Sequence, residues 1–188
     1  MERIRGWLFH KINKQRVPTE FPLQKGCPDI IPGLSATPWW YSKIFMEISH
    51  LNSRNNAEFP WIKEIEANYE VIKQELLQLR SQKGFQPYRG PSWVSKIKAK
   101  DGVGTVGTDS GDWNVFYLFL HDMKFDENCK KCPKTVEIIE KYFPRQYNHA
   151  FFSAVTPGTH IIKHNGPTNK KLRFHMPLIG VEGRYNIF

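Results

Sequence analysis

The chain has 188 residues, of which 40% are hydrophobic and 14% aromatic, so it can bury one core, and this excludes a disordered polypeptide. No apolar run approaches the roughly 18 residues of a membrane span, and the basic N-terminus is followed by no signal-peptide cleavage site. By default we expect a soluble, cytoplasmic protein without a membrane segment.

The formal net charge of +9 raises nucleic acid as a binding partner. The excess gathers in residues 130–188, which hold ten Lys or Arg residues against three Glu residues. Neither this region nor the basic residues 3–16 show a zinc-finger, recognition-helix or aromatic stacking pattern. A pocket for anionic ligands explains the same charge. We therefore expect no nucleic-acid partner and keep a basic nucleic-acid-binding protein as the weaker alternative.

Three cysteines, an odd number, argue against a disulfide framework and for a reducing compartment. Cys129 and Cys132 are spaced as a zinc-binding pair, but zinc needs four ligands and the sequence has no second pair. Cys27 and a histidine could supply the other two ligands, and this is the less favoured interpretation. The favoured interpretation is two thiols at the junction of a loop and a helix.

The N-terminal residues 1–58 are interpreted as an extended arm, because prolines recur through residues 18–38 and exclude a long helix there. The domain proper is expected at residues 59–188. It begins with a helix over 60–83, where apolar residues recur at spacings of three and four after Pro60.

The remaining elements are a loop, a short helix and a series of strands. Residues 84–111 are rich in Gly and Pro and are expected to form a loop, a helix is expected over 133–143, and strands are expected from residue 113 onward. The predicted strands cover 113–120, 150–155, 159–162, 172–178 and 184–188. Helices followed by short strands indicate an α+β fold with helical cover on one face of an antiparallel sheet.

The segment from Phe151 to Leu178 carries the residues best suited to chemistry. On a strand, Arg173 and His175 would share one face about 7 Å apart, and a guanidinium with an imidazole can bind a carboxylate. A solvent-facing strand surface would show the same pattern. His160 and His164 would lie roughly 13 Å apart on an extended chain and could not bind one metal. His164 is the better candidate, because it precedes the Asn165-Gly166-Pro167 turn.

These motifs resemble the aspartyl/asparaginyl β-hydroxylase family in order and spacing. The resemblance is most specific in Pro157-Gly-Thr-His160, His164-Asn-Gly-Pro-Thr-Asn169 and Leu172-Arg-Phe-His175, and extends to Gly111-Asp-Trp113, Cys132-Pro-Lys-Thr135, Pro32-Gly-Leu34 and Trp39-Trp40. It implies a double-stranded β-helix, a jelly-roll or cupin-like core.

The resemblance also implies the chemistry of an iron(II)- and 2-oxoglutarate-dependent dioxygenase acting on Asp or Asn in a peptide. His164 would be the first iron ligand, and Ser153, Arg173 and His175 would hold the carboxylates of 2-oxoglutarate. Gly166 would stand where related oxygenases carry a carboxylate ligand.

The sequence departs from the family in one respect. The resemblance implies a second iron-binding histidine and a further arginine downstream of His175, and neither follows before Phe188. We therefore expect a β-helix that is incomplete at its C-terminus, little activity from this chain by itself, and self-association through an open sheet edge. The alternative is an interaction module that keeps the fold without the enzymatic activity.

Overall fold

The computed structural model describes residues 2–15, 17, 19, 22–34, 59–80, 82–92, 94–143 and 149–180. Its helices are α1 (Glu2–Ile12), the 3-10 helix η1 (Pro22–Gln24), α2 (Ile62–Ala67), α3 (Tyr69–Gln78), α4 (Asp126–Cys129) and α5 (Pro133–Tyr142). Its strands are β1 (Gln86–Pro87), β2 (Arg89–Gly90), β3 (Thr105–Val106), β4 (Thr108–Ser110), β5 (Trp113–Leu120), β6 (Met123–Lys124), β7 (His149–Val155) and β8 (His160–Ile161). The mixed α+β class is confirmed.

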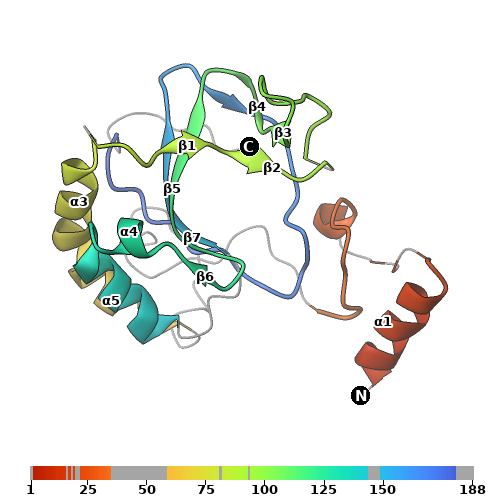
Figure 1. Cartoon of the computed structure of the whole chain (residues 1–188). Coiled ribbons are helices and arrows are strands. Elements are labelled where there is room, and N and C mark those ends of the chain that lie inside the picture. Colours follow the sequence, from red (N-terminus) through yellow and green to blue (C-terminus); the bar gives the residue numbers. More distant parts are fainter. Residues whose placement is uncertain are drawn as a thin grey trace, which may run out of the picture.

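Strand β5 is the centre of the largest sheet (Figure 1). Its run of aromatic and aliphatic residues suits a buried strand, and β7 pairs antiparallel with it from Trp113 opposite Val155 to Leu120 opposite His149. The short strands β1 and β6 pair with the two ends of β5. Two further pairs, β2 with β3 and β4 with β8, form small antiparallel sheets of their own.

The helices α3, α4 and α5 cover one face of this sheet (Figure 1). Phe116 and Phe152 face each other across β5 and β7 and point into the core beneath these helices. Leu79 and Val136 contribute to the same core from the helical side. Burial of such side chains is the main favourable contribution to folding, at about 1.5–3 kcal/mol each.

Cys129, the last residue of α4, and Cys132 belong to this core as free thiols. Cys132 directly precedes α5, whose first residue is Pro133. Burial raises the pKa of Cys129, and burial together with the charge of Glu75 raises that of Cys132 to about 12. Both groups are therefore protonated at neutral pH, which disfavours metal binding and redox exchange.

Two expectations about the helices were wrong. The segment expected as an extended arm contains α1, because its prolines begin only at residue 18 and leave residues 2–12 free to form a helix. The helix expected over 60–83 is divided into α2 and α3 at Asn68, whose side-chain amide donates to the carbonyl of Glu64 at 2.7 Å and competes with the helical backbone pattern. The helix over 133–143 is confirmed as α5.

Three expectations about the strands also needed correction. Residues 84–111 form the short strands β1 to β4 rather than a plain loop, so strands begin before residue 113. The strand expected over 172–178 is absent, because no described strand pairs with it and Pro177 lacks an amide donor. Within the described residues the small sheets do not close into a double-stranded β-helix.

Some expectations concern residues outside those described. The strand expected at 184–188 and the Trp39-Trp40 motif are among them. The proposed boundary between residues 58 and 59 borders residues 35–58, which are also outside the described part, and it stays a prediction.

Candidate active site

The face of β5 and β7 that points away from the helices carries Ser153, and two further predicted site residues, His164 and Arg173, lie beside it. Opposed residues of an antiparallel pair share a face, so Trp113 and Tyr117 of β5 lie on the same side as Phe151 and Ser153 of β7. We call this surface the outer face. It is rich in aromatic side chains, whereas Phe116 and Phe152 occupy the helix-covered side.

Trp113 contacts the residues at one end of the outer face. Its indole Nε1 donates to the Oγ of Ser153 at 2.9 Å, and its ring stacks on Tyr88 with 3.9 Å between centroids. The ring of His164 lies 6.1 Å from Trp113. Gly107 permits this packing, because a Cβ there would lie 2.9 Å from the indole. Trp113 therefore brings Ser153 and His164 to one place.

His164 follows β8 and has a defined ring orientation. Its Nδ1 lies 2.8 Å from the carbonyl oxygen of Ile162, which can only accept a hydrogen bond. In the neutral form of the ring, Nδ1 therefore carries the proton and Nε2 keeps its lone pair. Metal-binding histidines in proteins commonly have this arrangement, in which one nitrogen donates to a carbonyl and the other binds the metal.

Arg173 lies at the other end of the outer face. Its Nη2 is 3.3 Å from Nδ1 of His149, and its guanidinium carbon is 5.7 Å from the centre of the Phe151 ring. Burial lowers the pKa of His149 to about 4, with smaller effects from the charges of Arg173, His121 and Lys171. His149 is therefore neutral at pH 7 and can accept the hydrogen bond from Arg173.

Arg173 and Phe174 point to different sides without forming a strand. Phe174 points away from Arg173 and contacts Trp61, with 5.5 Å between ring centroids. His175 is exposed, and partial desolvation together with the charge of Arg173 lowers its pKa. The division between a cationic and an apolar side is therefore kept for Arg173 and Phe174, although the strand on which it was predicted is absent.

The described residues bring together part of the predicted site. Ser153 and His164 both lie beside Trp113, and Arg173 lies over Phe151, two residues before Ser153 on β7. Adjacent residues on the same strand face are about 7 Å apart. Sequence reasoning missed Trp113, Tyr88, His149 and Phe151. For Trp113, His149 and Phe151 the signal was the alternation along two strands, which becomes informative only once the register of β5 and β7 is known, and Tyr88, between β1 and β2, had no such signal.

The fit of these residues to iron is incomplete. Nowhere in the described part of the chain do three or more His, Cys, Asp or Glu side chains gather in a way that could hold a metal ion. His164 would supply one ligand, whereas Fe(II) sites of this class use at least two histidines. The donors Ser153, Arg173 and His175 fit a dicarboxylate better, because each can donate a hydrogen bond to a carboxylate oxygen.

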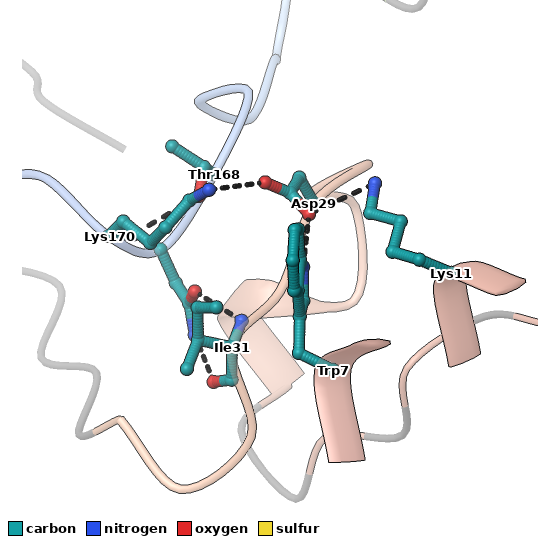
Figure 2. A network of polar contacts seen from close by, with 7 residues as sticks. Trp7, Lys11, Asp29, Ile31, Thr168 and Lys170 are labelled. Atoms are coloured by element: carbon teal, nitrogen blue, oxygen red, sulfur yellow. Dashed lines mark hydrogen bonds and ion pairs between the residues drawn. The ribbon is translucent and has the colours of Figure 1, made fainter. Parts of the chain in front are cut away.

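The turn that follows His164 is held by the N-terminal segment. The amide of Asp29 donates to the carbonyl of Pro167 at 3.1 Å, and the amide of Ile31 donates to Oδ1 of Asn169 at 2.8 Å. Asn169 in return donates to the carbonyl of Ile31 at 3.0 Å. We call these contacts, with those of Asp29 below, the clasp (Figure 2).

Asp29 is the charged centre of the clasp. Its carboxylate accepts from Nε1 of Trp7 at 2.8 Å and is paired with Lys170 at 2.8 Å and with Lys11 at 3.1 Å (Figure 2). Burial opposes ionisation, but the hydrogen bonds from Lys170, Trp7 and Lys11 outweigh it and lower the pKa of Asp29 to about 2. The Asp29 carboxylate is therefore ionised at all physiological pH values. Its contacts hold α1 against the turn after His164.

Comparison with known protein families gives a match over most of the domain. The family profile described as aspartyl/asparaginyl beta-hydroxylase matches residues 66–185. This range includes the outer face of β5 and β7, the His164 turn and Arg173.

Curated relatives share this region. The ornithine lipid ester-linked acyl 2-hydroxylase of Rhizobium tropici is 33% identical over 125 residues, which cover 66% of this chain and 41% of that protein. The aspartyl/asparaginyl beta-hydroxylase of Mus musculus is 29% identical over 154 residues, covering 79% of this chain and 17% of the relative. The Homo sapiens protein of the same name is 30% identical over 155 residues, again 17% of its length. The chain thus spans less than half the length of these relatives.

Proposed function

Because the chain belongs to the aspartyl/asparaginyl β-hydroxylase family, we propose that it carries part of the active site of an Fe(II)- and 2-oxoglutarate-dependent peptidyl-Asp/Asn hydroxylase. The observation that supports this most directly is the meeting of Ser153 and His164 at Trp113, with Arg173 on the same outer face. In this proposal Ser153, Arg173 and His175 bind the 2-oxoglutarate carboxylates, and His164 offers its Nε2 to iron.

The roles of the individual residues follow from their contacts. Arg173 has a planar fork suited to a carboxylate, and its neighbour His149 is neutral, so it accepts a hydrogen bond from the guanidinium without adding a second positive charge. Trp113 and Tyr88 form a stacked aromatic wall, and the indole N–H of Trp113 orients the Ser153 hydroxyl. Substrate would approach this wall.

We further propose that this chain by itself binds Fe(II) weakly and turns over little 2-oxoglutarate. The basis is that His164 has no partner ligands among the described residues. The experiment is a succinate assay on the purified chain with Fe(II), ascorbate, 2-oxoglutarate and an Asp- or Asn-containing peptide. Robust, iron-dependent succinate release would contradict the proposal of low activity and would support the hydroxylase function.

A His164→Ala variant distinguishes the loss of Fe(II) binding from the loss of 2-oxoglutarate binding. It should abolish the residual affinity for Fe(II). Its affinity for 2-oxoglutarate should fall only to the value that the unmodified chain has without Fe(II). His160→Ala is the matched control, because His160 lies four residues away on β8 and pairs instead with Asp109 at 2.7 Å. Equal iron binding by the two variants would remove His164 from the proposed site.

Two alternatives are tested in the same experiments. The Rhizobium tropici relative is named as a hydroxylase of a lipid acyl chain, so an acyl chain is the second substrate class to assay. The other alternative is an interaction module without enzymatic activity, which is favoured by the single candidate ligand. That alternative predicts that neither Fe(II) nor 2-oxoglutarate raises the thermal stability of the chain.

A further inference from the structure

Helix α1 carries an apolar stripe that points away from the domain. Ile4, Leu8 and Ile12 recur every four residues along one side of the helix and are 56%, 44% and 77% exposed. Phe9, beside this stripe, is 57% exposed. Amphipathic helices in globular proteins normally turn such a stripe toward the core. In α1 the apolar side is the outer side.

The inner side of α1 is already occupied. Trp7 and Lys11 reach Asp29 in the clasp, and a Cβ placed on Gly6 would lie 3.9 Å from the ring of Pro32. These contacts fix the rotation of the helix about its axis and leave Ile4, Leu8 and Ile12 exposed. In Figure 1, α1 (red) stands apart from α3 and α5 and projects from the body of the molecule.

The charge around the stripe is positive. Arg3, Arg5 and Lys14 lie on or just after α1 and are exposed, against the acidic residue Glu2 of the helix, whereas Lys11 is paired with Asp29. Basic residues beside an exposed apolar stripe complement a surface that offers negative charge above an apolar layer. Nucleic acid offers the negative charge without the apolar layer, and a typical protein surface offers no continuous layer of negative charge above an apolar layer.

From this arrangement we infer that α1 is an interfacial helix that docks the chain on an anionic lipid bilayer. Ile4, Leu8 and Ile12 enter the boundary between headgroups and acyl chains, and Arg5 and Lys14 contact the anionic headgroups. The clasp couples this helix rigidly to the turn after His164, so the bilayer holds that turn in a fixed orientation. The inference is independent of the hydroxylase chemistry proposed above.

The experiment is flotation of the whole chain with vesicles of phosphatidylcholine, alone or mixed with phosphatidylserine. The expected result is binding to the mixed vesicles that weakens as salt is raised, and much weaker binding to phosphatidylcholine alone. Ile4→Glu/Ile12→Glu should lower the affinity for the mixed vesicles by about tenfold or more, because it places charge in the apolar stripe. Arg5→Glu should lower it by more than about fivefold, because each basic residue contributes roughly that factor.

The matched control is Val71→Glu, the same kind of change on the exposed side of α3, where Val71 is 43% exposed. It should bind vesicles like the unmodified chain, and circular dichroism checks that every variant is folded. Arg5→Glu leaves the apolar stripe intact and tests the inference even if the double variant unfolds.

Three outcomes would overturn the inference. The first is no binding of the unmodified chain to phosphatidylserine vesicles, and the second is equal loss of binding in Val71→Glu and in the α1 variants. The third is an unmodified chain that is dimeric without lipid and becomes monomeric in Ile4→Glu/Ile12→Glu, because the stripe would then be a contact between two copies.

Discussion

The carboxylate of Glu75 in α3 caps the first turn of α5 at Thr135. It accepts from the backbone amide of Thr135 at 2.8 Å, from the Thr135 hydroxyl at 2.7 Å and from the amide of Lys134 at 2.9 Å. Helix α5 has no side-chain cap of its own, since Cys132 occupies the N-cap position. A residue 60 positions away in sequence thus satisfies two amides that a local Ser or Asp usually satisfies.

We therefore expect Glu75→Ala to lower the free energy of unfolding by about 2–4 kcal/mol, because it leaves the buried amide and hydroxyl of Thr135 and the part-buried amide of Lys134 without an acceptor. Glu75→Gln, which keeps one carbonyl oxygen, should cost less. The measurement is chemical denaturation, with Gln74→Ala as the exposed control on the same helix. A cost for Glu75→Ala no larger than that of the control would show that the cap does not stabilise α5.

For Arg173 the prediction concerns co-substrate binding. Arg173→Lys keeps the charge but loses the planar fork, so the apparent Michaelis constant or dissociation constant for 2-oxoglutarate should rise substantially. Arg173→Ala should cost on the order of 2–5 kcal/mol of binding, because one carboxylate is left unpaired. Titration calorimetry measures both, with Lys163→Ala as an exposed control. Unchanged affinity in Arg173→Ala would mean that this guanidinium faces only solvent.

His149 should make the stability of the chain sensitive to acid. Its pKa is lowered to about 4 in the folded chain, below the value near 6.5 of an unfolded chain, so the unfolded state binds more protons between these values. The contribution is fully present above pH 6.5 and is lost as the pH falls toward 4. In His149→Asn, which keeps an acceptor for Arg173, the stability should fall less over this range. Denaturation curves at several pH values test this, with His160→Asn as the control, and parallel curves for the two variants would contradict it.

Strand β7 should promote self-association. Within the described residues it pairs with β5 only, so its other edge presents unpaired backbone groups, and Val155 at its end is 54% exposed. Sedimentation velocity should show an average mass that rises with protein concentration. Val155→Lys should suppress the rise, because a charge at a strand edge opposes pairing. A monomer at all concentrations would contradict the prediction.

Sequence patterns predicted the structure best where the residues of a single helix or strand were enough to specify it. The aromatic run of β5 and the proline-started helix α5 were predicted correctly, because local residue preferences and burial agree there. The break at Asn68 was missed, since its cause is one side chain that binds the backbone of Glu64 within an otherwise regular apolar pattern.

Long-range relationships were beyond the sequence patterns. The capping of α5 by Glu75 and the support of Asn169 by Ile31 depend on tertiary contacts that have no local signal. The same applies to Trp113, whose neighbours Ser153 and His164 are known only from the pairing of β5 with β7 and the path of the turn. Residue types for the candidate site could therefore be proposed, but the partners that orient them could not.

The clasp has a further consequence for the order in which the chain folds. Ile31 and Asn169 are separated by 138 residues, whereas Glu75 and Thr135 are separated by 60, so the core beneath α3 and α5 can form before the clasp closes. Contacts that form after the folding transition state affect mainly the unfolding rate. Weakening the clasp should then shorten the lifetime of the native state and leave the refolding rate nearly unchanged. The contacts of the N-terminal segment would therefore stabilise the native state by lowering its unfolding rate.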